Sequence, residues 1–195
     1  MKQVFKSVVV LLTGLITFAC SETQTSPRGP QAPSYSLGSG GSRQGFSIEG
    51  DVVTPAGQHI HLTGGGSFDP STASNTIGDA TKGHGEGGFS CVSDFPTGRF
   101  GGCVGGQGTH WDSEQLLVSS PFTCGFPGEQ AKTVFTGEGV IVLKADFYRA
   151  GDGDEASFHA NMFVADRDLE PDVDGIQNVW IQGVGCGNAN VHFSN

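Results

Sequence analysis

The sequence predicts an all-β domain, an antiparallel β-sandwich or open barrel, preceded by a signal segment and a disordered tether. Three observations predict this fold class. Glycine and proline are abundant, with 32 and 9 residues, and both interrupt regular structure. Many short runs alternate between apolar and polar residues, which is the pattern of a half-buried strand. No stretch of the domain sustains the apolar period of about 3.6 residues that an amphipathic helix needs.

Residues 1–20 have the layout of an export signal. Lys2 and Lys6 give this segment a basic start, and a short apolar run at residues 8–16 follows. This run is too short to span a bilayer as a mature helix. We therefore expect the chain to leave the cytoplasm.

The sequence Thr-Phe-Ala-Cys at residues 17–20 resembles the lipobox of bacterial lipoproteins. The resemblance implies cleavage before Cys20 and attachment of lipid to this cysteine, so that the membrane becomes a partner of the protein. Thr17 stands where that motif usually has a leucine-like residue. An ordinary signal peptide, cut near Ala19 or after Cys20, is the alternative, and the protein would then be secreted.

Residues 21–45 are rich in Ser, Pro, Gly and Gln and nearly free of apolar side chains, which predicts a flexible tether. Residues 46–195 are expected to form a single domain, which is long enough to bury a core. Without Lys2 and Lys6 the chain has eight basic and twenty acidic residues, a formal charge of −12. Nucleic acid needs a basic surface and is therefore excluded as a partner.

Strands are predicted in the first half of the domain by alternation at residues 46–53, 59–62 and 83–92. In the second of these, Ile60 and Leu62 face one side. A strand is expected at residues 110–120, with a helix as the alternative. The glycine-rich segments, including residues 64–66, are interpreted as turns because they lack the strand-to-helix context of a phosphate-binding loop.

The centre of the domain is predicted to be a hairpin of two long strands, residues 133–149 and 157–166, joined by the polar turn 151–155. The first strand is apolar on both faces in its middle, which favours burial between two layers. Glycines inside it indicate a bend or bulge. Further strands are expected at residues 179–184 and 191–193. Most of the core is expected to come from the 14 phenylalanines.

Four cysteines remain after Cys20, and an even number in an exported domain predicts two disulfides. We prefer the pairs Cys91–Cys103 and Cys124–Cys186, because a turn between the first two cysteines can close a hairpin. The two other pairings remain open.

Acidic residues occur at every second position of residues 166–174. Oxygen ligands spaced in this way can point inward together from a curved loop, which is what Ca²⁺ requires. The segment is not an EF-hand, because its sixth position is Pro171. A solvated acidic loop is the alternative interpretation. The predicted calcium ligands are Asp166, Asp168, Glu170, Asp172 and Asp174.

His59 and His61 share one strand face at a spacing that can hold Zn²⁺. The sequence places no third ligand beside them, and hydrogen-bonded surface histidines are the alternative. A secreted metal-dependent hydrolase that uses these histidines and loop carboxylates is the competing hypothesis for function. We found no motif for nucleophilic catalysis.

The order of several short motifs resembles the post-COAP type of β-domain in exported bacterial proteins. A Gly-Gly-Gly-Ser-Phe segment begins at residue 64, and Phe-Thr-Gly-Glu-Gly spans residues 135–139. An acidic Asp-x-Glu-Pro segment at residues 168–171 and a Gly-Asn-Ala-Asn-Val-His strand at residues 187–192 follow. That family usually has a small residue where this chain has Asp172. The resemblance implies an accessory or binding β-domain and no enzyme.

Together these observations predict an exported and lipid-anchored β-protein of the bacterial cell envelope. We expect a non-catalytic binding or structural role, with calcium as a candidate stabilising ion. A protein or glycan partner is expected, although the sequence does not identify it.

Overall fold

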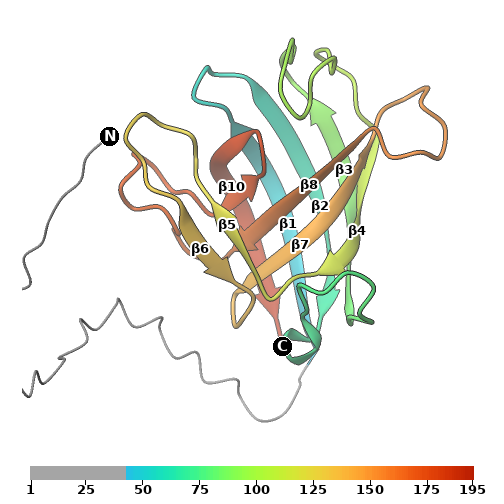
Figure 1. The fold of residues 1–195 in the computed structure, drawn as a ribbon, viewed down its shortest axis with the longest axis vertical. Helices are drawn as coiled ribbons and strands as arrows, with labels where there is room; N and C mark the ends of the chain where they lie inside the picture. Colours follow the sequence, from blue (N-terminus) through green and yellow to red (C-terminus); the bar gives the residue numbers. More distant parts are fainter. Residues whose placement is uncertain (1–42) are drawn as a thin grey trace, which may run out of the picture. The chain divides into compact units, whose positions relative to one another are not determined.

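The computed structural model describes residues 43–195, and within them eight antiparallel strands close into a β-barrel (Figure 1). The all-β prediction is confirmed, with the sheet fully closed. The signal segment, Cys20 and the tether up to residue 42 lie outside the described residues. In their order around the barrel the strands are β1 (Gln44–Val53), β10 (Gly185–Ser194), β9 (Val179–Ile181), β8 (Phe158–Ala165), β7 (Val140–Tyr148), β4 (His110–Leu116), β3 (Gly83–Cys91) and β2 (His59–Phe68).

Large apolar side chains fill the interior of the barrel. Alternate residues of each strand point inward, so Ile60 and Leu62 of β2 are fully buried, as the alternation predicts. Trp111 of β4 lies across the interior, and its indole Nε1–H donates to the backbone oxygen of Thr63 at 3.0 Å. Gly85 of β3 makes room for this ring, because a Cβ there would press on Trp111. The core is therefore packed by side chains from the whole circumference.

Aromatic rings close both ends of the barrel. At one end the long connection between β3 and β4 places Phe100 against Phe147 and Phe158, with ring centroids 5.2 and 4.7 Å away. We call this connection, residues 92–109, the plug. At the other end Phe46, Phe68 and Phe193 contact one another at centroid distances of 6.1–6.3 Å. These phenylalanines thus pack the core, as the sequence analysis expects, whereas Phe126 is 41 % exposed.

A second, two-stranded sheet lies on the outside of the barrel. Its strands are β5 (Ser119–Phe122) and β6 (Lys132–Phe135), and we call residues 117–137 the flap. The flap covers the outer face of β7, β8 and β9, where it encloses a second apolar cluster. Phe122 of the flap packs edge-on against Phe163 of β8 with ring centroids 5.0 Å apart. A short 3₁₀ helix, η1 (Pro70–Thr72), follows β2.

The flap explains the main difference between prediction and structure. Residues 133–149 were expected to form one strand, but the chain turns between β6 and β7 and uses two sheets. Gly139 permits the turn because it has a φ of +67°, a conformation that favours glycine. The run at residues 110–120 divides in the same way, between β4 of the barrel and β5 of the flap. Both faces of β7 are apolar near Val140 because the flap covers the outer one.

The sequence predicts a turn for the glycines at residues 64–66, and this prediction is wrong. They lie inside strand β2. A Cβ at Gly64 or Gly66 would collide with the backbone of β3, and one at Gly65 would collide with that of β1. The close approach of neighbouring strands therefore requires glycine here. The alternation of apolar residues that usually indicates a strand is absent from this half of β2, which is why the sequence suggested a turn.

Candidate functional site

Three side chains that are able to ligate a metal ion converge on the outer wall of the barrel, each from a different strand. They are Glu114 of β4, Asp146 of β7 and His159 of β8, and we call them the outer-wall cluster. One ligand atom of each residue lies within 4.8 Å of those of the other two. Within residues 43–195 this is the one group of three or more His, Cys, Asp or Glu residues with such spacing.

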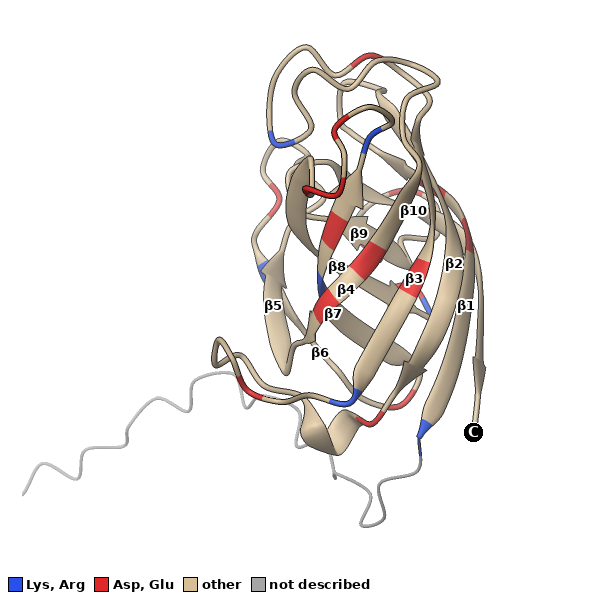
Figure 2. Cartoon of the chain, turned by 90° about the vertical axis from the view of Figure 1, so that its right-hand side faces the viewer, with Lys and Arg blue, Asp and Glu red and all other residues tan. Residues whose placement is uncertain are grey.

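The register of the sheet brings the cluster together. Asp146 lies directly opposite His159 in the pairing of β7 with β8, and opposite Asp112 in the pairing of β7 with β4. The Nδ1 atom of His159 lies 2.6 Å from Oδ1 of Asp146. Figure 2 shows that acidic residues lie side by side in the middle of neighbouring strands on this wall. The cluster therefore lies within an acidic part of the surface.

A β-bulge presents Glu114 at this site. The register of β4 with β7 shifts between Ser113 and Gln115, so that Glu114 is an extra residue in its strand. Trp111 and Leu116 on either side of the bulge are fully buried, whereas the side chain of Glu114 is 43 % exposed. Regular alternation from Leu116 would place residue 114 inside the barrel. The bulge instead turns its carboxylate outward, toward Asp146 and His159.

Together with Arg99, whose Nη1 donates to the backbone oxygen of His159 at 2.7 Å, Lys144 is a cation in contact with the cluster residues. Its Nζ lies 2.6 Å from Oε2 of Glu114. Tyr148 borders the cluster from the same strand and stacks on His110, with ring centroids 4.3 Å apart and planes 3° from parallel. Burial and the carboxylates of Asp112 and Asp146 raise the pKa of Tyr148, which is the effect expected of a negative local field.

The acidic loop between β8 and β9 is fastened to the flap by a lysine. Glu170 is fully buried, and its Oε1 accepts a hydrogen bond from Nζ of Lys132 in β6. The same Nζ donates to Oδ2 of Asp172 at 2.8 Å. Hydrogen bonds to Asp172 and Glu170 raise the pKa of Lys132, and the bond to Lys132 lowers the pKa of Asp172. Two of the five predicted calcium ligands are therefore engaged with a lysine.

The other three residues of the loop make separate contacts. Asp168 Oδ1 accepts backbone N–H groups of Glu170 and Gln177 at 3.0 and 3.1 Å. Asp166 is bonded to the neighbouring Arg167, and the backbone oxygen of Asp174 accepts from the Gln177 side chain. In the described part of the chain no three of the five bring their ligand atoms within 4.8 Å of each other. Calcium binding by this loop stays a prediction.

His59 and His61 share the outer face of β2, as their spacing predicts, but each has its own contact. The Nδ1 atom of His61 lies 2.8 Å from Oδ1 of Asp51 on β1. The backbone N–H of His59 donates to the Ser93 hydroxyl at 3.3 Å. A third metal ligand does not join the two histidines anywhere in residues 43–195. Zinc binding here, and the hydrolase that would use it, stay predictions.

Both disulfides preferred from the sequence are present in the structure. Cys91–Cys103 joins the end of β3 to the plug, and its two Cα atoms are 6.2 Å apart. Cys124–Cys186 joins the flap to β10, with Cα atoms 4.8 Å apart. Each bond therefore ties a non-barrel segment to the barrel.

The sequence analysis missed the outer-wall cluster. Alternation along β8 places His159 on the face opposite the core residues Phe158 and Ala160. Glu114 gave no signal, because a bulge cannot be read from apolar spacing alone. Asp146 lies within a mostly apolar stretch of β7, so the sequence did not mark it as a candidate ligand. Their convergence depends on the pairing of three strands, of which two are separated by the whole flap.

Comparisons of the chain with known protein families, curated proteins and solved structures gave no match. In residues 43–195 no helix has both the length and the apolar character that crossing a membrane requires.

Proposed function

We propose that this chain is an exported, lipid-anchored β-barrel domain of the bacterial cell envelope with a non-catalytic binding or structural role. The observation that carries the proposal is a barrel whose interior is filled by its own side chains and whose two attached segments are each held by a disulfide. A partner would meet this domain at its outer wall and loops, since the interior is occupied by Trp111 and the phenylalanines.

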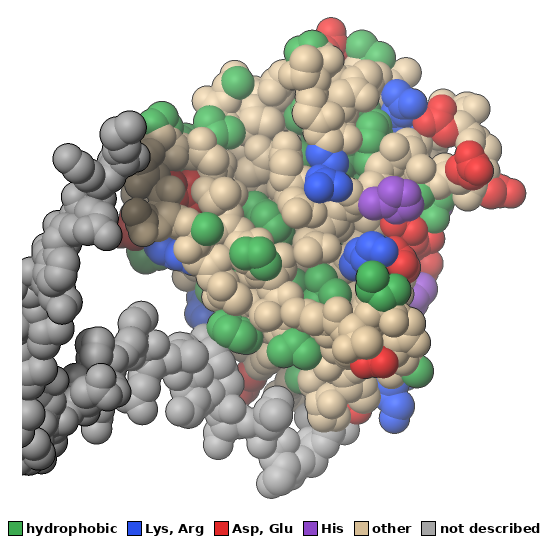
Figure 3. Space-filling model, viewed as in Figure 1, with side chains coloured by type: hydrophobic (Ala, Val, Ile, Leu, Met, Phe, Trp, Pro, Cys, Tyr) green, Lys and Arg blue, Asp and Glu red, His purple; other side chains and the backbone are tan. Residues whose placement is uncertain are grey.

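The two disulfides support export, because such bonds form and persist in oxidising compartments. The cysteine at position 20, next to a small residue and after an apolar run, supports lipid attachment. Lipid on Cys20 would place the barrel at a membrane surface through residues 21–42. On the face that Figure 3 shows, hydrophobic side chains form only small separate groups, so a partner that bound this face would meet mostly polar groups.

The proposal is tested by mass spectrometry of the mature protein isolated from bacterial membranes. We expect an acylated N-terminal Cys20 and four remaining cysteines that resist alkylation until they are reduced. The variant Cys20→Ala should move the protein from the detergent phase to the aqueous phase without changing the disulfides. An unmodified Cys20 in the membrane-bound protein, or four free thiols in the folded domain, would contradict the proposal.

A further inference from the structure

The outer-wall cluster has a donor set that suits a transition metal. It offers one imidazole and two carboxylates, on Glu114, Asp146 and His159. Zn²⁺ accepts nitrogen and carboxylate oxygen ligands together, whereas Ca²⁺ takes six to eight oxygen ligands. The imidazole therefore distinguishes this cluster from the all-oxygen acidic loop and favours a divalent transition metal over calcium.

The spacing of the ligand atoms is close to what an ion would impose. Ligands held about 2.0–2.2 Å from one ion lie up to about 4.4 Å from each other. The ligand atoms of the cluster lie within 4.8 Å of one another, which is close to this limit. Because all three residues lie on paired strands, small rotations of the side chains would complete the site without movement of the backbone.

Electrostatics at the cluster also favours a cation. Asp112 lies on β4 with Glu114 and opposite Asp146, and Glu86 lies opposite Asp112 on β3. Lys144 opposes them through its ion pair with Glu114, but its side chain is 35 % exposed and can turn into solvent. The cluster and its surroundings thus hold four carboxylates against two cations, Lys144 and Arg99, and the histidine His159.

We propose that Glu114, Asp146 and His159 bind one divalent transition-metal ion, such as Zn²⁺, on the outer wall of the barrel. The remaining coordination positions face solvent, since Glu114 and His159 are exposed. Binding displaces the contact between His159 and Asp146 and frees Lys144 from Glu114. The proposal rests on this geometry alone and does not depend on lipid anchoring.

Titration calorimetry with ZnCl₂ on the metal-stripped mature protein tests the proposal. We expect saturable binding of one ion per chain. His159→Gln and Glu114→Gln should each weaken Zn²⁺ binding by at least the 10–100-fold that is typical for loss of a supporting residue at a metal site. His61→Gln is the matched control, because His61 is also an outer-wall histidine whose Nδ1 contacts an aspartate, Asp51. It should leave the affinity unchanged.

Lys144→Met provides a test in the opposite direction. Removal of the competing ammonium should strengthen Zn²⁺ binding by about two- to five-fold, the size of one exposed ion pair. Circular dichroism spectra of all variants should match that of the parent protein, so that loss of binding is not loss of fold. The proposal is overturned by the absence of saturable binding at millimolar ZnCl₂. Equal losses in His61→Gln and His159→Gln would overturn it as well.

Discussion

The two halves of the outer face of β7 and β8 differ sharply although the same two strands form them. In one half, Val142 and Phe163 are fully buried beneath the flap. In the other half, His159 is 60 % exposed and Asp146 beside it is half-buried. Asn161 marks the boundary, where its side-chain amide donates to the Ser120 hydroxyl of the flap at 3.1 Å. The inner faces of both halves are uniformly apolar.

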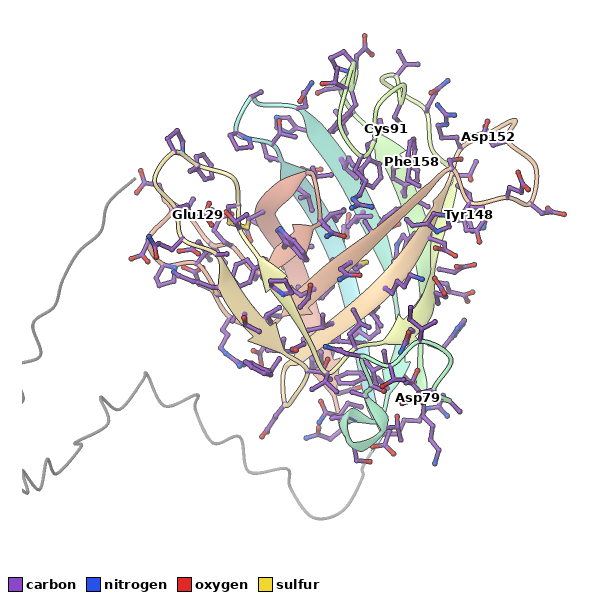
Figure 4. All side chains as sticks on the ribbon, in the orientation of Figure 1. Asp79, Cys91, Glu129, Tyr148, Asp152 and Phe158 are labelled. Carbon is purple, nitrogen blue, oxygen red and sulfur yellow. A yellow bond between two sulfur atoms is a disulfide. The ribbon has the colours of Figure 1, made fainter. Side chains whose placement is uncertain are left out.

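The difference shows that one half of the hairpin packs against the flap, whereas the other half presents polar and ionisable side chains. Covering the first half with β5 and β6 allows large apolar side chains on the outside of a barrel strand. The second half is left free to carry polar groups in a fixed register, because the rest of the hairpin supplies the stability. Figure 4 shows both regions, with Glu129 in the flap loop and Tyr148 on the open side.

Truncation of an apolar residue in the covered half should have the largest effect. Phe163→Ala removes a fully buried ring that packs against Phe122 and Trp180. We expect it to lower the free energy of unfolding by about 3–5 kcal/mol in urea titrations. The matched change in the open half, His159→Ala, should cost less than about 0.5 kcal/mol. Similar losses of unfolding free energy for the two variants would show that the covered and open halves contribute equally to stability.

Loss of the lysine that joins the acidic loop to the flap should also have a large effect. Lys132→Met leaves Glu170 buried without its cation, which we expect to cost about 3 kcal/mol. The double variant Lys132→Met/Glu170→Leu should recover most of this loss, because it removes the uncompensated charge. Urea unfolding of the two variants measures both effects. A double variant as unstable as the single one would indicate that the stability is lost with the ion pair itself and not through the unpaired, buried carboxylate of Glu170.

The disulfide of the flap should matter more than that of the plug. Cys124–Cys186 closes a loop of 62 residues and Cys91–Cys103 one of 12. In the chain-entropy account, removal of a bridge costs about 2–4 kcal/mol and the longer loop costs about 1.5 kcal/mol more. Chemical unfolding of the Cys124→Ser/Cys186→Ser and Cys91→Ser/Cys103→Ser variants checks this order. The reverse order would show that packing of Phe100 in the plug depends on its disulfide.

Local alternation predicted much of this fold, because the side-chain period of a strand is independent of its partners. It correctly placed Ile60 and Leu62 together on one face, which lines the core. It could not predict that the chain leaves the barrel after β4 and returns at Gly139, since both strands of the flap look like continuations of barrel strands. Apolar residues on both faces of β7 were the available signal for a second layer.

The candidate site was less accessible to sequence reasoning. The acidic loop attracted attention because its carboxylates are regularly spaced, yet Lys132, which binds two of them, is 38 residues from Glu170 in the chain. The outer-wall cluster has no regular spacing at all. A bulge presents Glu114, and pairing across three strands supplies the rest. Such sites are defined by register, which depends on the whole barrel.

The smallest expected effect concerns a carboxylate in the flap loop. Glu129 accepts backbone N–H groups of Cys124, Gly125 and Phe126 at 2.6–3.0 Å. Burial acts to raise the pKa of Glu129, but these hydrogen bonds outweigh it and the pKa is lowered. A lowered pKa means that the ionised carboxylate stabilises the fold above the ordinary pKa of about 4.3, and that this stability is lost as pH falls further.

Glu129→Gln should therefore lower the melting temperature by about 1–2 °C near pH 7. It should also speed hydrogen exchange at the amides of Cys124, Gly125 and Phe126. Both differences from the parent protein should shrink as the pH falls below the ordinary pKa of a glutamate and Glu129 becomes protonated. Glu155→Gln, in the exposed turn on the open side, is the control and should change neither. A difference that persists unchanged at acid pH would mean that shape, rather than charge, holds the loop. The flap would then be fastened to the covered half by its packing and its disulfide alone.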